Sequence, residues 1–178
     1  MSTPDLAVEV RDLCARRDIH DVICNYMRGQ DRLMPTLHRS AFHDDAYVDC
    51  GLFAGDADGF VGFAQGFLAE LKGSQHLIGQ AQIRVDGNVA YGEVYFIAWH
   101  RIVENGADKD LIVAGRYIDE YQDRGQGWKI AKRRELIDWA RTDLAADSFL
   151  KDQVGLVLGA RGADDFSNQR VWPGAGAR

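Results

Sequence analysis

Apolar residues recur at helical spacing in the first third of the chain, which predicts helices there. The spacing first appears at Leu6, Val10 and Leu13, and again at Ile19, Val22, Ile23, Tyr26 and Met27. Pro4 and Asp5 are typical of a helix start, and Asp18 is a candidate cap for a second helical segment. Pro35 ends that segment and opens a short helix over residues 36–42.

A second helical stripe precedes a long run of predicted strands. A short strand is expected at Ala46–Cys50, followed by the loop GLFAGDADG. The stripe comprises Phe60, Phe63, Ala64, Phe67, Leu68 and Leu71, and Gly73 ends it. Four segments rich in β-branched and aromatic residues then alternate with the turns DGN, ENGAD and DRGQG, over residues 75–85, 89–103, 110–123 and 128–143. Helices followed by a strand meander indicate an α+β fold, with helices on one face of a curved antiparallel sheet.

The strand expected at 89–103 has two different faces. Its even positions, Val94, Phe96, Ala98 and His100, are smooth and apolar and end in one histidine. This set suits the concave side of a sheet that lines a pocket. The odd positions, from Tyr91 to Arg101, mix aromatic and charged residues, which suggests a surface for self-association.

The length of 178 residues fits one domain, with a core over about residues 10–142. Residues 143–178 are expected to form one more helix and a tail that stays loose unless Phe166 or Trp172 docks. The net charge of −6 disfavours nucleic acid and anionic membrane surfaces as partners. The N-terminus MSTPDLAVEVRD lacks a secretory pattern, so we expect a cytoplasmic protein. Three cysteines without CxxC spacing disfavour disulfides and zinc, and we expect them to be buried free thiols.

The candidate chemistry is a carboxylate with an imidazole. No phosphate-binding loop, HExxH pair or GxSxG nucleophile elbow is present. Asp31 follows an apolar helical face in NYMRGQDRLM, and His76 begins the strand region in GSQHLIGQ. Taken alone, such an aspartate is usually a cap and such a histidine is usually structural. An imidazole is nevertheless the natural base for removing a proton from carbon near neutral pH.

The chain resembles the SnoaL-like group of the nuclear-transport-factor-2-like superfamily. The segments that carry the resemblance are QDRLM, DDAYVD, QHLIGQ, AGRYIDEYQDRGQGWKI and LIDW, within residues 10–142. The enzymes it is most similar to are scytalone dehydratase, hexachlorocyclohexane dehydrochlorinase and bile acid 7α-dehydratase. The resemblance implies a cone-shaped barrel, in which helices pack on a strongly curved, mostly antiparallel sheet of five or six strands. It also implies that no cofactor or metal is used, and that the chain forms a homo-oligomer, a trimer rather than a dimer.

The resemblance implies a catalytic set of Asp31, His76 and His100. Asp31 would orient the His76 imidazole, which takes a proton from carbon, and His100 would handle a departing hydroxyl. In scytalone dehydratase two tyrosines stand where this chain has Gln30 and Cys50. A serine and an asparagine of that pocket correspond to Gly115 and Tyr117, so scytalone is not expected as the substrate.

The expected pocket binds a small hydrophobic ring compound. Its predicted lining is Tyr26, Phe53, Phe67, Val94, Phe96, Ala98, Tyr117 and Ile137. Tyr26 matches a tyrosine of the bile acid enzyme and would donate a hydrogen bond, with a core aromatic as the alternative. Arg133 would bind a substrate oxygen or halide, with a solvated strand arginine as the alternative.

Three functions remain open on the sequence. The first is a dehydratase-like lyase that works by histidine base catalysis. The second is an isomerase or cyclase in the same pocket, which would leave the mass of the product unchanged. The third is a ligand-binding or assembly module without catalysis, which would form a stable complex with a larger partner.

Overall fold

The computed structural model describes residues 5–153 and 155–172. Its elements, in order, are α1 (Leu6–Asp31), α2 (Pro35–Ser40), β1 (Phe42–Asp49), β2 (Ala54–Asp56), α3 (Ala57–Ala69), β3 (Gly73–Asp86), β4 (Val89–Glu104), β5 (Ala107–Asp123), β6 (Trp128–Leu144), α4 (Ser148–Asp152), a 3₁₀ turn (Gly162–Asp164) and α5 (Phe166–Gln169).

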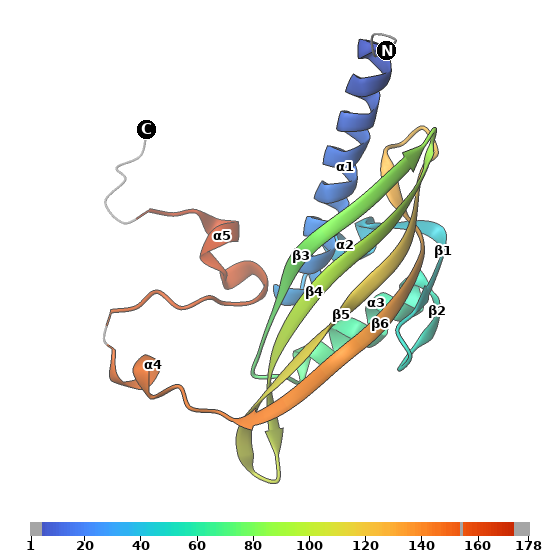
Figure 1. Ribbon diagram of the computed structural model, residues 1–178. Helices are drawn as coiled ribbons and strands as arrows, with labels where there is room; N and C mark the ends of the chain where they lie inside the picture. Colours follow the sequence, from blue (N-terminus) through green and yellow to red (C-terminus); the bar gives the residue numbers. More distant parts are fainter. Residues whose placement is uncertain (1–4, 154, 173–178) are drawn as a thin grey trace.

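The strands form one sheet in the order β2-β1-β6-β5-β4-β3. Every pairing is antiparallel except that of β1 with β6, which is parallel. The sheet curves around α1, α2 and α3, which lie on one side of it (Figure 1). The expected α+β cone is therefore confirmed, with six strands.

Strand β4 follows the predicted alternation over most of its length. Val94, Phe96, Ala98 and His100 are buried on the concave face of β4, whereas Tyr91 and Ile97 of the opposite face are about half exposed. Leu77 and Trp139 are likewise half exposed. These exposed apolar side chains fit the expected self-association, which stays a prediction.

Helix α1 is continuous, which corrects the expected break at Asp18. Asp5 caps it by accepting a hydrogen bond from the Ala7 amide at 2.9 Å, whereas Pro4 lies outside the described residues. Asp18 lies inside the helix, because the buried residues Ala15 and Ile19 on either side of it belong to one continuous face. The first turns extend beyond the sheet (Figure 1), so Leu6 is 75% exposed while Ile23 is fully buried.

Close contacts between backbones determine how α2 packs on α1 and how β6 packs on β5. A side chain at Gly29 of α1 would lie 2.5 Å from the His38 amide nitrogen, so glycine allows α2 to pack directly on α1. A side chain at Gly115 would overlap the Leu136 carbonyl oxygen. Gly115 lies at an irregularity in the β5–β6 register, where the β6 backbone crosses close to β5.

The residues after β6 differ from the single helix that was expected. They form the short segments α4 and α5 and a 3₁₀ turn, because Gly155, Gly159 and Gly162 interrupt any helical run. The chain returns to the body through polar groups. The Gly162 amide donates to the Arg32 carbonyl at 2.7 Å, and Arg161 donates to the Leu68 and Leu71 carbonyls at 2.9 and 3.0 Å.

The predicted apolar anchors of the tail are largely exposed. Phe166 and Trp172 are 36% and 65% exposed and contact each other edge to face. The return of the chain to the body therefore depends on polar residues such as Arg161 and Asp165, which pairs with Arg32 of the body at 3.5 Å.

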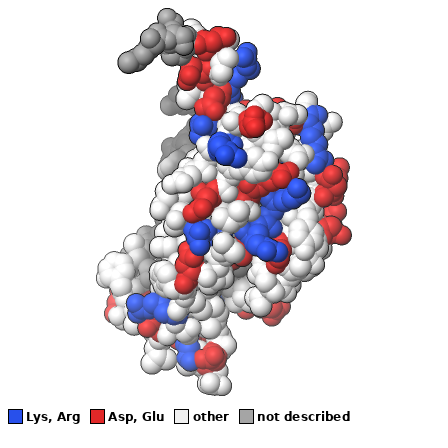
Figure 2. All heavy atoms as spheres, turned by 45° about the vertical axis from the view of Figure 1, so that its right-hand side comes forward, with Lys and Arg blue, Asp and Glu red and all other residues white. Residues whose placement is uncertain are grey.

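Surface charges are largely paired. Arg116 pairs with Asp138 and Arg134 with Asp49, and Figure 2 shows a face on which acidic and basic side chains are interleaved. Within the described part of the chain, no helix is long and apolar enough to span a bilayer. Cys14, Cys24 and Cys50 are free thiols, as expected, but they are partly exposed rather than buried.

Candidate active site

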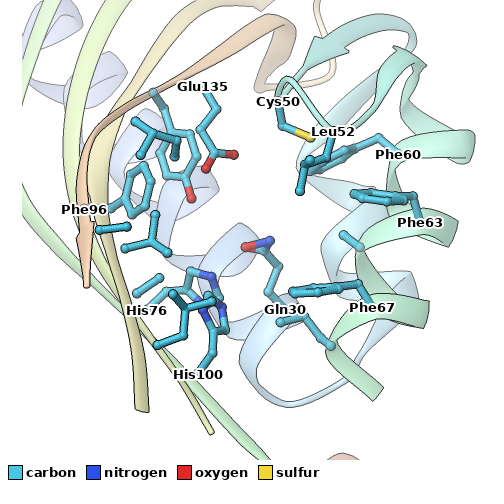
Figure 3. A pocket seen from close by; sticks show the side chains of 18 residues that line it. Gln30, Cys50, Leu52, Phe60, Phe63, Phe67, His76, Phe96, His100 and Glu135 are labelled. Atoms are coloured by element: carbon cyan, nitrogen blue, oxygen red, sulfur yellow. The ribbon is translucent and has the colours of Figure 1, made fainter. Parts of the chain in front are cut away.

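A cavity of about 380 Å³ lies between the concave face of the sheet and helix α3 (Figure 3). This volume is typical of a site for a small organic ligand. Its lining is mostly apolar and comprises Gln30, Cys50, Leu52, Phe60, Phe63, Ala64, Phe67, Leu68, His76, Phe96, Ala98, His100, Leu111, Val113, Tyr117, Glu135, Ile137 and Ala140. None of these described lining residues is a lysine or an arginine.

Asp31 and His76 form a paired group at the edge of this cavity. Asp31 is the last residue of α1, and His76 lies near the start of β3. One carboxylate oxygen, Oδ2, accepts from the His76 backbone amide at 2.9 Å, and Oδ1 is 2.7 Å from His76 Nδ1. Both side chains are nearly buried, with 11% and 6% exposure.

This geometry selects the tautomer of His76. A carboxylate only accepts hydrogen bonds, so Nδ1 carries the ring proton and Nε2 keeps its lone pair. His76 lines the cavity. A basic nitrogen, held in a fixed orientation by two hydrogen bonds to one carboxylate, is therefore available to a ligand.

His100 lies beside His76. Their ring centroids are 5.3 Å apart, and the rings meet edge to face. His100 is buried, and its Nδ1 has no hydrogen-bond partner among the described residues. Burial, together with the positive charge of a protonated His76, lowers the pKa of His100 to about 4, so this ring is neutral at pH 7. A neutral imidazole with an unpaired nitrogen can exchange a hydrogen bond with a ligand oxygen.

Five of the residues expected to line the pocket do so. They are Phe67 of α3, Phe96 and Ala98 of β4, Tyr117 of β5 and Ile137 of β6. The Phe96 and Tyr117 rings stack with centroids 4.5 Å apart, which gives the sheet side of the cavity a flat aromatic surface.

Tyr26, Phe53 and Val94 do not border the cavity, contrary to the expectation. Tyr26 is 1% exposed because the rings of His38, Phe42, Phe60 and Tyr117 enclose it. Phe53 packs on Phe60 and Phe63 and so supports the cavity wall from outside. Val94 is fully buried in the core, opposite Tyr117 in the sheet register.

Arg133 fits neither expected alternative, since it is neither in the cavity nor in solvent. Its guanidinium donates two hydrogen bonds of 2.7 Å to Asp119, and both side chains are essentially unexposed. The guanidinium carbon lies 4.1 Å from the ring centroids of both Tyr26 and Tyr117, which meet edge to face. Asp119 also accepts from the Tyr121 hydroxyl at 2.5 Å. Arg133 therefore holds the aromatic floor beneath the site.

Two polar residues of the lining were not predicted to bind a ligand: Glu135 was missed, and Gln30 was noted only as the counterpart of a tyrosine in scytalone dehydratase. Gln30 precedes Asp31 on α1 and is 6% exposed, and its Oε1 has no partner among the described residues. Glu135 lies directly across the sheet from Tyr117. Burial raises the pKa of Glu135, while Arg133 and a protonated His76 lower it. Strand alternation from Arg133 to Ile137 could have indicated that Glu135 faces inward.

Metal binding finds no support in the described residues, which contain no group of three or more His, Cys, Asp or Glu side chains able to hold an ion. The polar groups that do converge are one imidazole–carboxylate pair, one neutral imidazole, one amide and one carboxyl. Such a set can transfer protons and bind neutral oxygen atoms.

Comparisons with known proteins agree with this architecture. Residues 11–134 match the SnoaL-like domain family. No curated protein sequence matches the chain. A hexachlorocyclohexane dehydrochlorinase of type 2 is 19% identical, over 78% of this chain and 95% of its own, with a TM-score of 0.71.

Two further solved structures give the same result. A putative scytalone dehydratase from Novosphingobium aromaticivorans is 21% identical, with a TM-score of 0.65, and covers 73% of this chain and 88% of its own. The Kfla4162 protein from Kribbella flavida is 16% identical, with a TM-score of 0.67, and covers 73% and 95%. At these identities the likeness shows a shared fold.

Proposed function

This chain belongs to the SnoaL-like family of the nuclear-transport-factor-2-like superfamily, and on that basis we propose that it is a cofactor-independent lyase for a small hydrophobic ring compound. The observation that carries the proposal is the His76–Asp31 pair, 2.7 Å apart at the edge of an apolar cavity. The two solved relatives named as a dehydrochlorinase and a dehydratase support it, because both names describe elimination reactions.

The proposed reaction starts at His76 Nε2. This nitrogen takes a proton from a carbon of the substrate, the C–H electron pair forms a C=C bond, and the neighbouring carbon loses its leaving group. The Asp31 carboxylate stabilises the imidazolium that results, because it already accepts the Nδ1 proton. Positioned base catalysis of this kind contributes roughly 10²- to 10⁴-fold to the rate.

His100 binds the substrate in this proposal. Its buried and unpartnered Nδ1 lies on the ring next to His76, and a ligand oxygen is the natural partner for it. Because its pKa is lowered to about 4, His100 is a neutral hydrogen-bonding group rather than a second cation. Two adjacent imidazolium ions are thereby avoided when His76 takes up its proton.

The experiment measures exchange and elimination together. Neutral cyclic β-hydroxy ketones are incubated in D₂O with the protein, and the products are followed by NMR and mass spectrometry. We expect a product lighter by one water, and deuterium in the recovered substrate wherever His76 returns a solvent deuteron to the carbon before the leaving group departs. His76→Ala and Asp31→Ala should lose both signals by at least about 10²-fold.

The matched control is His20→Ala, which removes an exposed histidine from the surface of α1 and should change neither signal. Retained activity in both site variants would reject the proposal. Deuterium exchange without loss of water would instead assign an isomerase or cyclase. Failure to exchange any substrate proton, together with a stable complex with a larger partner, would assign a binding or assembly module.

A further inference from the structure

The side of the cavity that faces the histidines carries a second polar group. Glu135 projects from β6 into the cavity, while His76 and His100 project from β3 and β4 on the other side (Figure 3). Gln30 of α1 points into the space between them. A ligand in this cavity therefore touches an imidazole base on one side and a carboxyl group on the other.

Several helices and strands place side chains around Glu135. Arg133 on β6 and His76 on β3 are the positive or protonatable groups that favour its charged form. Tyr26 of α1, Tyr117 of β5 and Cys50 after β1 interact with it as neutral groups whose ionisation it disfavours. Helix α3 brings only apolar side chains to the cavity, namely Phe60, Phe63, Ala64, Phe67 and Leu68.

Arg133 leaves the charge of Glu135 largely uncompensated. Its guanidinium is bound on two nitrogens by Asp119, and its carbon lies 4.1 Å from the centroids of both the Tyr26 and Tyr117 rings. The positive charge of Arg133 is therefore already balanced by the Asp119 carboxylate. Glu135 itself is surrounded by the apolar lining, and burial is the largest influence on its pKa, which is raised.

We propose that Glu135 is the general acid of the site, which protonates a hydroxyl leaving group on the face of the substrate opposite His76. This assignment rests on the proposed lyase function and narrows its substrate class. The substrate is a neutral ring compound that carries a hydroxyl group on the carbon next to an acidic C–H, as in a β-hydroxy ketone. A neutral substrate fits, because the described lining contains the carboxyl of Glu135, with Asp31 behind His76, and no lysine or arginine.

The step balances without a further reactant. His76 Nε2 takes the proton from carbon, and the C–H electron pair becomes the second bond of the alkene. The C–O electron pair leaves with the oxygen, which takes the proton of the Glu135 carboxyl and departs as water. The imidazolium of His76 then returns a proton to the Glu135 carboxylate through solvent, and the site is reset.

Glu135 suits this role better than His100. Because its pKa is lowered to about 4, His100 is a neutral imidazole at pH 7, which is a very weak acid. A buried carboxyl with a raised pKa keeps its proton to higher pH than an exposed glutamate does. Gln30 Oε1, also unpartnered, accepts the hydroxyl hydrogen and turns the oxygen lone pair toward Glu135.

The decisive experiment varies the leaving group. 3-Hydroxycyclohexanone and 3-(4-nitrophenoxy)cyclohexanone give the same enone, but 4-nitrophenolate leaves without needing a proton. In Glu135→Gln we expect elimination of water to fall about 10²- to 10⁴-fold and elimination of nitrophenolate to fall less than about tenfold. Elimination of water by the natural chain should decline as pH rises through the pKa of Glu135, and the variant should lose this alkaline decline.

Controls separate this assignment from the lyase proposal. His76→Ala should lose both eliminations, and Glu93→Gln, on the opposite face of the sheet, should lose neither. Equal losses of both eliminations in Glu135→Gln, or no loss, would overturn the acid role while leaving the lyase proposal intact. No elimination of either compound by the natural chain would contradict both.

A second measurement needs no turnover. The infrared difference spectrum between the natural chain and Glu135→Gln isolates the carboxyl band of Glu135. We expect a protonated band that persists at pH values where exposed glutamates are ionised. A band that titrates at or below the ordinary glutamate pKa would overturn the assignment.

Discussion

Replacing Asp31 by asparagine tests the tautomer of His76 directly. Asp31 accepts two hydrogen bonds, from the His76 amide at 2.9 Å and from Nδ1 at 2.7 Å. An asparagine has one oxygen, which can satisfy the backbone amide, and its NH₂ group then faces Nδ1. A nitrogen that faces a donor must accept, so the ring proton moves to Nε2 and the base loses its lone pair.

The magnitudes follow from these two contacts. Exchanging two charge-assisted hydrogen bonds for neutral ones costs about 1–2 kcal/mol of unfolding free energy in a nearly buried pair. For a chain of this size that lowers Tm by roughly 2–8 °C. Turnover should fall much further, by about 10²- to 10⁴-fold, because the whole base contribution is lost.

Nitrogen NMR of histidine-labelled protein reads the tautomer without a substrate. We expect the proton of His76 on Nδ1 in the natural chain and on Nε2 in Asp31→Asn. Urea unfolding gives the stability change. Asp12→Asn is the control, since Asp12 lies on the same helix in an exposed pair with Arg16 and should cost less than about 0.5 kcal/mol. A natural chain protonated on Nε2, or a variant with undiminished turnover, would refute this tautomer assignment.

Two further predictions concern stability. Gly115→Ala should lower the free energy of unfolding in urea by about 1–3 kcal/mol, because the new methyl group overlaps the Leu136 carbonyl oxygen. The control is Gly62→Ala, in open space on α3, which should raise it by up to about 1 kcal/mol. Equal effects of the two substitutions would contradict the contact. Burial lowers the pKa of His38 to about 3 and that of His100 to about 4, below the ordinary 6.5. The unfolded chain therefore binds more protons than the folded chain below about pH 6.5. The free energy of unfolding should be highest above that pH and should fall toward pH 4, by up to about 1.4 kcal/mol per pH unit for each histidine. Unfolding free energies that agree at pH 7 and pH 5 would contradict this.

Most of the fold could be predicted because its pattern is local. The long strands begin and end at turns rich in Gly, Asp and Asn, so their predicted bounds lie within a few residues of the observed ones. Asp18 misled the prediction because a good capping residue also occurs inside helices, and packing on the sheet determines which applies. The tail was mispredicted because its attachment depends on Arg161, whose carbonyl partners lie about ninety residues earlier in the chain.

The site was predicted unevenly for a similar reason. Asp31 and His76 were chosen through a resemblance, and the structure brings them together, although their role stays a proposal. Tyr26 and Arg133 could not be assigned to the core or to the cavity, because that depends on which rings surround them. Arg133 has its partner Asp119 on the neighbouring strand, and only the strand register reveals the pairing.

Strand β6 has a consequence for how this chain can diverge from its relatives. Glu135, Ile137 and Ala140 all lie on β6 and line the wall of the cavity that faces the histidines. In the proposed reaction the base comes from β3, whereas this stretch of β6 supplies side chains that a substrate would meet on the opposite wall. Substitutions on β6 should therefore change which molecule is accepted while leaving the Asp31–His76 pair in place.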